Sequence, residues 1–214
     1  MSSDWSPDET SLVVTRGTTG DTVLFDLVEV ELETGDISVL ASPGAWPTYH
    51  PDGTQVAYCR HSSDDWMESF TEYDIYVLDL ESGESTFLTQ GMMPRWAPDG
   101  QKLAFARVDP DRVTDEASES YYGEGVGAGF DLYVWDAESG SEQRVYSASL
   151  SFGMHWFGGL SPVFGWGGGS SLLLYTEVSE EGRRVTSSVH LLDIETGESS
   201  AAPTSLVNPS WHID

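Results

Sequence analysis

The 214-residue sequence has few cations: nine Lys and Arg residues stand against 36 Asp and Glu, which gives a formal net charge of −27. A single one of the nine, Lys102, is a lysine. Proteins that bind nucleic acid electrostatically neutralise phosphates with clustered Lys and Arg, and anionic membranes attract the same residues. The composition therefore excludes an electrostatic nucleic-acid binder and disfavours a membrane surface as a partner.

Cysteine and long apolar runs are equally scarce. Cys59 is the single cysteine, so the chain forms no internal disulfide, and its apolar neighbours predict a buried and unreactive thiol. No run of about 18 apolar residues occurs, and the first ten residues are acidic without the apolar stretch of a signal peptide. The sequence as given therefore predicts a cytoplasmic protein.

Apolar residues are nevertheless plentiful enough to build a core. Aromatic residues make up 12% of the chain and apolar residues 39%. Highly charged disordered chains are usually poor in aromatics, so we interpret this chain as folded. The acids are spread along its whole length, which is typical of salt-adapted organisms, because concentrated salt screens the repulsion between like charges.

A repeat organises the chain. Similar segments begin at five aromatic residues: Trp5, Tyr49, Trp96, Trp166 and Trp211. The first three open turns of one type, which read Trp-Ser-Pro-Asp, Tyr-His-Pro-Asp-Gly and Trp-Ala-Pro-Asp-Gly. Pro presets φ in such a turn, and Asp and Gly suit its later positions, so each turn predicts a hairpin between two strands. We expect the repeated aromatics to pack between units.

A second turn recurs between these, with the pattern Glu-(Ser/Thr)-Gly. Its four glycines are Gly35, Gly83, Gly140 and Gly197. Each follows one run of alternating apolar residues and precedes another, as expected for a hairpin whose glycine takes a left-handed conformation. Runs such as Gln55-Val-Ala-Tyr-Cys59 and Asp74-Ile-Tyr-Val-Leu-Asp79 predict the strands. Each unit of about 45 residues thus holds four strands, the pattern of a β-propeller blade.

At this level the repeat resembles a known family. The segment Trp96-Ala-Pro-Asp-Gly followed by Leu103-Ala-Phe, and the segment Asp74-Ile-Tyr-Val-Leu-Asp-Leu-Glu-Ser-Gly83, are similar to the repeat of TolB-like, WD-repeat-like propellers. They also resemble the propeller domains attached to prolyl-oligopeptidase-type peptidases. The resemblance covers nearly the whole chain and implies an all-β propeller. Because propellers host many activities, it says little about function.

The repeat predicts a single domain, residues 1–214, with about four blades. The blades are expected at residues 5–42, 45–90, 92–148 and 162–204, with a closing strand at 206–213 and inserts at 109–129 and 148–161. Three arrangements stay open: a closed four-bladed ring, a ring that lacks further blades, and two open arcs that pair.

The motifs of common catalytic sites are missing from the sequence. It has no Gly-x-Ser-x-Gly nucleophile turn and no His-Glu-x-x-His zinc motif, and we expect no cofactor. Asp109, Asp111 and Asp115 in the acidic insert form a weak calcium candidate, because Val113 stands where a further oxygen ligand belongs. We favour a solvated loop there.

The inserts and one inner-strand arginine are the candidates for partner binding. The candidate residues are Tyr121, Tyr122, His155, Trp156, Phe157 and Arg95. Aromatic residues, Met and Arg are enriched in interface cores, so the two inserts could form one recognition rim, and a loop folded over a blade edge is the structural alternative. We expect Arg95 either to hold an anionic ligand or to neutralise neighbouring acids.

These observations favour a non-enzymatic scaffold that binds a protein or peptide, either as a monomer or as a homodimer. The rival hypothesis is a hydrolase- or lyase-type enzyme that uses His155 or His212 with carboxylates or a metal in the propeller channel. A third hypothesis is that the chain is one propeller of a longer peptidase-like protein.

Overall fold

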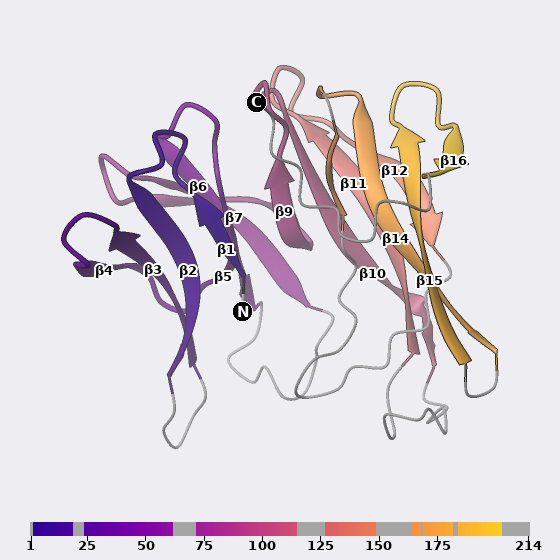
Figure 1. Cartoon of the computed structure of the whole chain (residues 1–214), viewed down its shortest axis with the longest axis horizontal. Coiled ribbons are helices and arrows are strands. Elements are labelled where there is room, and N and C mark those ends of the chain that lie inside the picture. Colours follow the sequence, from indigo (N-terminus) through magenta and orange to yellow (C-terminus); the bar gives the residue numbers. More distant parts are fainter. Residues whose placement is uncertain are drawn as a thin grey trace. The chain divides into compact units, whose positions relative to one another are not determined.

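The computed structural model describes residues 2–18, 24–61, 72–114, 127–148, 164–167, 169–181 and 184–202 (Figure 1). Strands and tight turns make up the regular structure of these residues, with no helix among them. In this described part of the chain, no helix is therefore long and apolar enough to cross a membrane.

Within these described ranges, sixteen strands form four antiparallel sheets of four strands each. The first sheet contains β1 (Ser3–Trp5), β2 (Ser11–Thr18), β3 (Leu24–Glu31) and β4 (Ile37–Ala41). The second contains β5 (Ala45–Tyr49), β6 (Gln55–His61), β7 (Tyr73–Asp79) and β8 (Ser85–Gln90). The third contains β9 (Met92–Trp96), β10 (Lys102–Thr114), β11 (Gly127–Asp136) and β12 (Glu142–Ala148). The fourth contains β13 (Phe164–Trp166), β14 (Leu172–Glu181), β15 (Arg184–Asp193) and β16 (Ser199–Ala201).

In every sheet the spatial order of the strands follows the chain. Tight turns join the first strand to the second and the third to the fourth, as the two kinds of turn predict. The four-stranded antiparallel units expected from the repeat are therefore confirmed.

The Glu-(Ser/Thr)-Gly turns share one hydrogen-bonding pattern. Their four glycines have φ between +66° and +75°, a left-handed conformation that glycine adopts without steric cost. In the second sheet the Gly83 N–H donates to the Asp79 carbonyl at 2.9 Å, and the Asp79 carboxylate accepts the Ser82 N–H at 2.8 Å. That bond and one from the Ser82 hydroxyl lower the pKa of Asp79. Part of the acidic composition is thus built into the turns.

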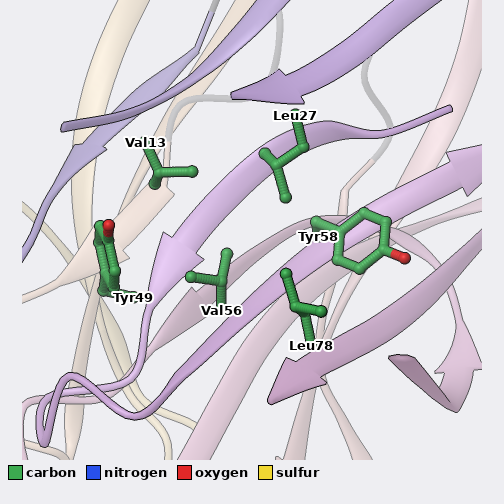
Figure 2. Packing of buried hydrophobic residues seen from close by; sticks show 6 residues of the cluster. All are labelled: Val13, Leu27, Tyr49, Val56, Tyr58 and Leu78. Carbon is green, nitrogen blue, oxygen red and sulfur yellow. The ribbon is translucent and has the colours of Figure 1, made fainter. Parts of the chain in front are cut away.

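The chain divides into two compact units, residues 1–105 and 106–214, with the boundary inside β10. In the first unit, the first sheet covers one face of the second (Figure 2). The core residues are Val13 and Leu27 of the first sheet and Tyr49, Val56, Tyr58 and Leu78 of the second. Each such side chain contributes about 1.5–3 kcal/mol when it is fully buried.

The second unit has its own apolar contacts. Leu173 and Leu192 of the fourth sheet are almost fully buried. Tyr146 on β12 packs on Tyr175 of β14 with ring centroids 4.3 Å apart, and the Tyr175 hydroxyl lies 2.9 Å from that of Ser199. The contact between Tyr146 and Tyr175 joins the third and fourth sheets within the unit.

The insert expected at residues 109–129 is partly strand. β10 continues to Thr114 and β11 begins at Gly127, so β10, with 13 residues, is longer than the equivalent strands β2, β6 and β14. Residues 149–161 of the second insert and the expected closing strand at 206–213 lie outside the described residues.

Candidate functional site

Most of the predicted partner residues cannot be placed. Tyr121, Tyr122, His155, Trp156 and Phe157 lie outside the described residues. The same holds for His212 and Trp211. The recognition rim and the rival histidine site therefore remain predictions from the sequence.

The repeated aromatic residues lie in unlike surroundings. Tyr49 is buried at 5% exposure, and Trp96 and Trp166 are partly buried. Trp5 differs, because 56% of its surface is exposed. The repeat places these residues at the same point of each sheet, but their burial depends on what covers that sheet.

Arg95 lies on β9, beside the inner strand of the second sheet. In the first unit β9 contacts β5, and β5 contacts β1. The residues Trp46 and Met93, each directly before the proline of its strand, have φ of +51° and +57°. Left-handed backbone costs a non-glycine residue about 1–2 kcal/mol, so both inner strands share a strained bend. Arg95 follows the second of these bends by two residues.

The negative charge of Asp4, on β1, acts on Arg95. The Asp4 carboxylate accepts the backbone N–H of Tyr49 at 2.8 Å and that of Trp5 at 3.1 Å. Burial raises the pKa of Asp4, although the bonds from Tyr49 and Thr48 and the charge of Arg95 oppose the rise. Burial also lowers the pKa of Arg95, against the charge of Asp4. The charges of Arg95 and Asp4 thus favour each other, and Asp4 is a partly buried carboxylate that joins two inner strands. The two roles expected for Arg95, holding an anionic ligand or neutralising neighbouring acids, stay predictions.

A pocket of about 210 Å³ lies on one face of the third sheet, within the second unit. Its lining residues come from β10, β11 and β12, and are Arg107, Val108, Asp109, Asp131, Tyr133 and Arg144. Two of the nine cationic residues of the chain thus line one small pocket. The two aspartates that also line it, Asp109 and Asp131, balance these charges, so the pocket lining has no formal net charge in a protein of charge −27.

Arg107 is held tightly at one side of the pocket. Its guanidinium donates to both carboxylate oxygens of Glu142, at 3.0 and 3.1 Å, and lies 4.3 Å from the ring centroid of Tyr133. Partial burial acts to lower the pKa of Arg107, but the hydrogen bonds and charge of Glu142 outweigh it and the pKa is raised. Such bidentate pairing fixes the geometry of the side chain.

Arg144 is held more loosely on the other side. Its guanidinium lies 3.3 Å from the buried carboxylate of Asp131, which also accepts the Ser147 hydroxyl at 2.8 Å. The Arg144 side chain is 58% exposed. A register shift between Leu132 and Tyr133 pairs Tyr133 directly with Arg144 and so places both on the face that bears the pocket. Arg144 can therefore reach a ligand while Asp131 positions it.

The calcium candidate lies only partly within the described residues. Asp109 is a wall of the pocket, Asp111 lies within β10, and Asp115 is outside the described residues. Among the described residues, no group of three or more His, Cys, Asp or Glu residues could hold a metal ion. Cys59 is fully buried, and burial raises the pKa of its thiol. A buried thiol of raised pKa is a poor nucleophile.

Sequence reasoning missed the pocket. Arg107 and Asp109 alternate along β10, but Arg60 holds the position of Arg107 in the second sheet, so this alternation does not mark the pocket. The register shift that brings Arg144 to the same face has no signature in the sequence, because one bulged residue reverses which side chains share a face.

Comparisons with known proteins give relatives of partial coverage. No family model matches the chain. A Bacillus subtilis protein called "Uncharacterized peptidase YuxL" is 31% identical over 103 residues, 46% of this chain and 13% of that protein. "Dipeptidyl-peptidase 5" of Porphyromonas gingivalis is 31% identical over 70 residues, 30% of this chain and 10% of that protein. The chain thus spans about an eighth or less of each relative's length.

Solved structures share the fold across nearly the whole chain. TolB from Acinetobacter baumannii has a TM-score of 0.60 and 19% identity over 94% of this chain and 42% of its own. The β-propeller domain of the Pyrococcus furiosus Trilobed protease has a TM-score of 0.57 and 14% identity over 94% of this chain and 56% of its own. The chain has a TolB-like β-propeller fold. This confirms the resemblance inferred from the repeat.

An oligogalacturonate lyase solved with manganese is similar to the same degree, with a TM-score of 0.58 and 14% identity over 94% of this chain and 52% of its own. At such identity the likeness concerns the fold alone. The likeness to solved structures therefore gives no preference between peptidase-associated and lyase-like functions.

Proposed function

We propose that this propeller is the non-catalytic part of a peptidase-like protein and that it binds peptides without cleaving them. The observation that carries the proposal is that both curated relatives described above bear peptidase names at 31% identity. The proposal combines two expectations from the sequence, a peptide-binding scaffold and a propeller of a longer peptidase-like protein.

The chemistry of the pocket in the third sheet supports a peptide carboxylate as the ligand group. A guanidinium recognises a carboxylate through two parallel hydrogen bonds, and Arg144 is exposed enough to form them. The volume of about 210 Å³ is below the roughly 300–1,000 Å³ of pockets for whole small molecules. It suits the end of a peptide, whose carboxylate would meet Arg144 and whose polar backbone would meet Asp109 and Tyr133.

A direct test compares short peptides with free and amidated C-termini. Binding is measured by fluorescence anisotropy in about 2 M KCl, where self-repulsion of the chain is screened. We expect the free carboxylate to bind at least about tenfold more tightly than the amide, and Arg144→Gln to remove that difference. Arg16→Gln is the matched control, because Arg16 also pairs with an aspartate, Asp26, on a sheet surface but lies far along the chain from the pocket residues.

The same preparations are tested for cleavage of aminoacyl- and dipeptidyl-p-nitroanilides. We expect no release of nitroaniline. Cleavage by the purified chain, or equal binding of both peptides to the unmodified protein and to Arg144→Gln, would contradict the proposal.

A further inference from the structure

Equivalent positions in the four sheets differ in burial. Two side chains follow the repeated aromatic by seven and nine residues: Leu12 and Val14, Val56 and Tyr58, Leu103 and Phe105, and Leu173 and Tyr175 in sheets one to four. In the second, third and fourth sheets, both are at most 5% exposed. In the first sheet both are only partly buried. The first sheet therefore carries the core pattern of the others without their burial.

Strand register gathers the apolar side chains of the first sheet on one face. Trp5 pairs with Leu12, Leu12 with Val30, and Val14 with Val28. Val30 and Val28 pair in turn with Ile37 and Val39 of β4. Directly paired residues of an antiparallel sheet project to the same side. We call this set the apolar face; it consists of Trp5, Leu12, Val14, Val28, Val30, Ile37 and Val39.

Three members of the apolar face are largely exposed: Trp5 at 56%, Ile37 at 58% and Val39 at 55%. The corresponding face of the second sheet, with Tyr49, Val56, Tyr58 and Leu78, is covered by Val13 and Leu27 of the first sheet (Figure 2). In the second sheet, a face of similar composition is therefore covered by a neighbouring sheet of the same protein. Exposed apolar surfaces of this kind mark interaction sites.

Charge indicates what covers the apolar face. Among the described strand residues of the first sheet, the charged ones on this side are Arg16 and Asp26, which pair at 2.9 Å. The other acids of these strands, Asp4, Glu29 and Glu31, lie on the opposite side. The apolar face thus has no net charge, in a chain of −27. A partner surface rich in acids would lose the hydration of its carboxylates here without gaining an ion pair.

We propose that the apolar face is the docking site for a second copy of this chain, with the same face of each copy packed against the other. Such a symmetric contact brings together two neutral apolar surfaces, whereas the charge of −27 makes a neutral patch elsewhere on the chain scarce. Two antiparallel sheets pack face to face at a separation of about 10 Å, with interdigitating side chains. Trp5, Ile37 and Val39 supply the side chains that interdigitate.

The test measures the mass of the full chain by sedimentation equilibrium up to about 100 μM. We expect a dimer whose affinity rises between about 0.15 M and 2 M KCl, because salt screens the repulsion between two acidic copies. Val39→Asp should weaken the dimer at least about 100-fold, because each copy then buries an unpaired carboxylate. Phe87→Asp is the matched control: Phe87 is 52% exposed and holds the same position on β8.

Two further variants keep the result independent of folding defects. Val39→Cys adds one exposed thiol to a chain whose own cysteine is buried, so oxidation should give a covalent dimer, whereas Phe87→Cys should not. Trp5→Phe identifies the fluorescence of Trp5 by difference; in the dimer this signal should resist quenching by iodide.

Three outcomes overturn the proposal. If the chain is a monomer at every salt concentration and iodide quenches Trp5, nothing covers the apolar face. A monomer with Trp5 protected shows that the chain covers its own face, for example with residues 203–214. A dimer that Val39→Asp leaves intact uses another surface. A dimer lost in Val39→Asp and kept in Phe87→Asp supports the proposal.

Discussion

In the first unit, three neighbouring turns share the sequence Pro-Asp, followed by Gly in the second and third turns and by Glu9 in the first, and the two contacts between these turns differ. Gly53 in the second turn and Gly100 in the third both have left-handed backbone, with φ of +75° and +70°. A side chain added at Gly53 would lie 3.7 Å from Pro7 of the first turn, an ordinary contact. One added at Gly100 would lie 2.5 Å from the ring of His50 of the second turn. The contact between the first and second turns has space for a side chain at Gly53, and we call it loose. The contact between the second and third turns has none at Gly100, and we call it closed.

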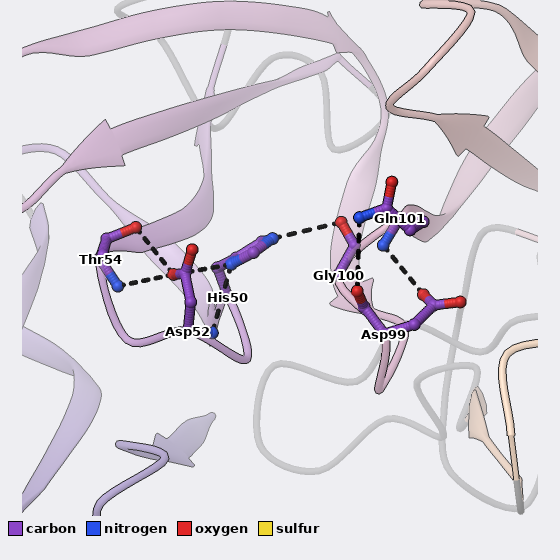
Figure 3. A network of polar contacts seen from close by, with 6 residues as sticks. All are labelled: His50, Asp52, Thr54, Asp99, Gly100 and Gln101. Carbon is purple, nitrogen blue, oxygen red and sulfur yellow. Dashed lines mark hydrogen bonds and ion pairs between the residues drawn. The ribbon is translucent and has the colours of Figure 1, made fainter.

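Figure 3 shows what closes the second contact. Nε2 of His50 lies 3.2 Å from the Gly100 carbonyl oxygen, and Nδ1 lies 2.8 Å from the Asp52 carboxylate, an ion pair whenever the ring is protonated. The ring also stands edge-on to Trp96 with centroids 4.7 Å apart. Ser6 holds the equivalent position in the first turn, and its hydroxyl bonds to Asp8 of its own turn. The residue after the repeated aromatic therefore decides whether adjacent turns are joined.

The largest expected effect is that of Gly100→Ala. A left-handed alanine costs about 1–2 kcal/mol, and the new methyl group must also displace a ring held by three neighbours. We expect a loss of about 3 kcal/mol in the free energy of unfolding, measured by urea titration in concentrated salt. A loss no greater than that of Gly53→Ala would show that His50 moves freely and that the contact is not closed.

A double-mutant cycle measures the coupling between His50 and Gly100 in the closed contact. In a His50→Ala background the ring no longer meets the new methyl group, so Gly100→Ala should cost only the conformational strain. We expect a coupling energy of about 1–2 kcal/mol between the two positions. The same cycle between Pro7 and Gly53 serves as the control and should give a coupling near zero. Equal couplings in both cycles would remove the distinction between the two contacts.

Local regularities made the architecture predictable from the sequence. The Pro-Asp-Gly and Glu-(Ser/Thr)-Gly turns act over four or five residues, and alternation of apolar residues sets the strands between them. The role of His50 was not predictable in the same way. Its ring acts on Gly100, and a contact over 50 residues depends on how two turns are placed in space.

The pocket was unpredictable for a related reason. Arg107 and Asp109 alternate visibly along the sequence, but Arg144 joins them through a bulge in β12 that no local signal marks. The exposure of Trp5 was also not predictable from the sequence, because the repeat sets the position of a residue in its sheet but does not determine which surface covers that sheet. Tyr49 and Trp5 occupy the same position at 5% and 56% exposure.

Gly53→Ala tests the loose contact, between the first and second turns. Pro7 leaves room for the methyl group, so the expected cost is the strain of a left-handed alanine alone, about 1–2 kcal/mol. Gly83→Ala, where no atom lies within 4 Å of the added methyl group, is the matched control and should cost the same. A clearly larger loss at Gly53 than at Gly83 would mean that the first two turns are also in tight contact.

The smallest expected effect concerns the carboxylate of the closed contact. The N–H of Thr54, at 2.9 Å, and then its hydroxyl, at 2.7 Å, lower the pKa of Asp52 to about 2. Because this pKa is below its ordinary value, the group stabilises the fold above pH of about 4, and that contribution is lost as the pH falls through about 2. Thr54→Val, which keeps the N–H, should raise the pKa by less than about 1 unit, as followed by carboxyl NMR.

Thr10→Val makes the same change in the first turn, where the Thr10 hydroxyl bonds to Asp8 at 2.8 Å and helps to lower its pKa. Both variants should shift their own aspartate to a similar extent, since these bonds lie within single turns. The two turns should differ in the response of the imidazole: the His50 ring signals should follow the titration of Asp52, because Nδ1 faces that carboxylate, and should ignore the titration of Asp8. Ring signals that follow neither aspartate would mean that the carboxylate takes no part in holding His50 against Gly100, and that the stack on Trp96 alone closes the contact.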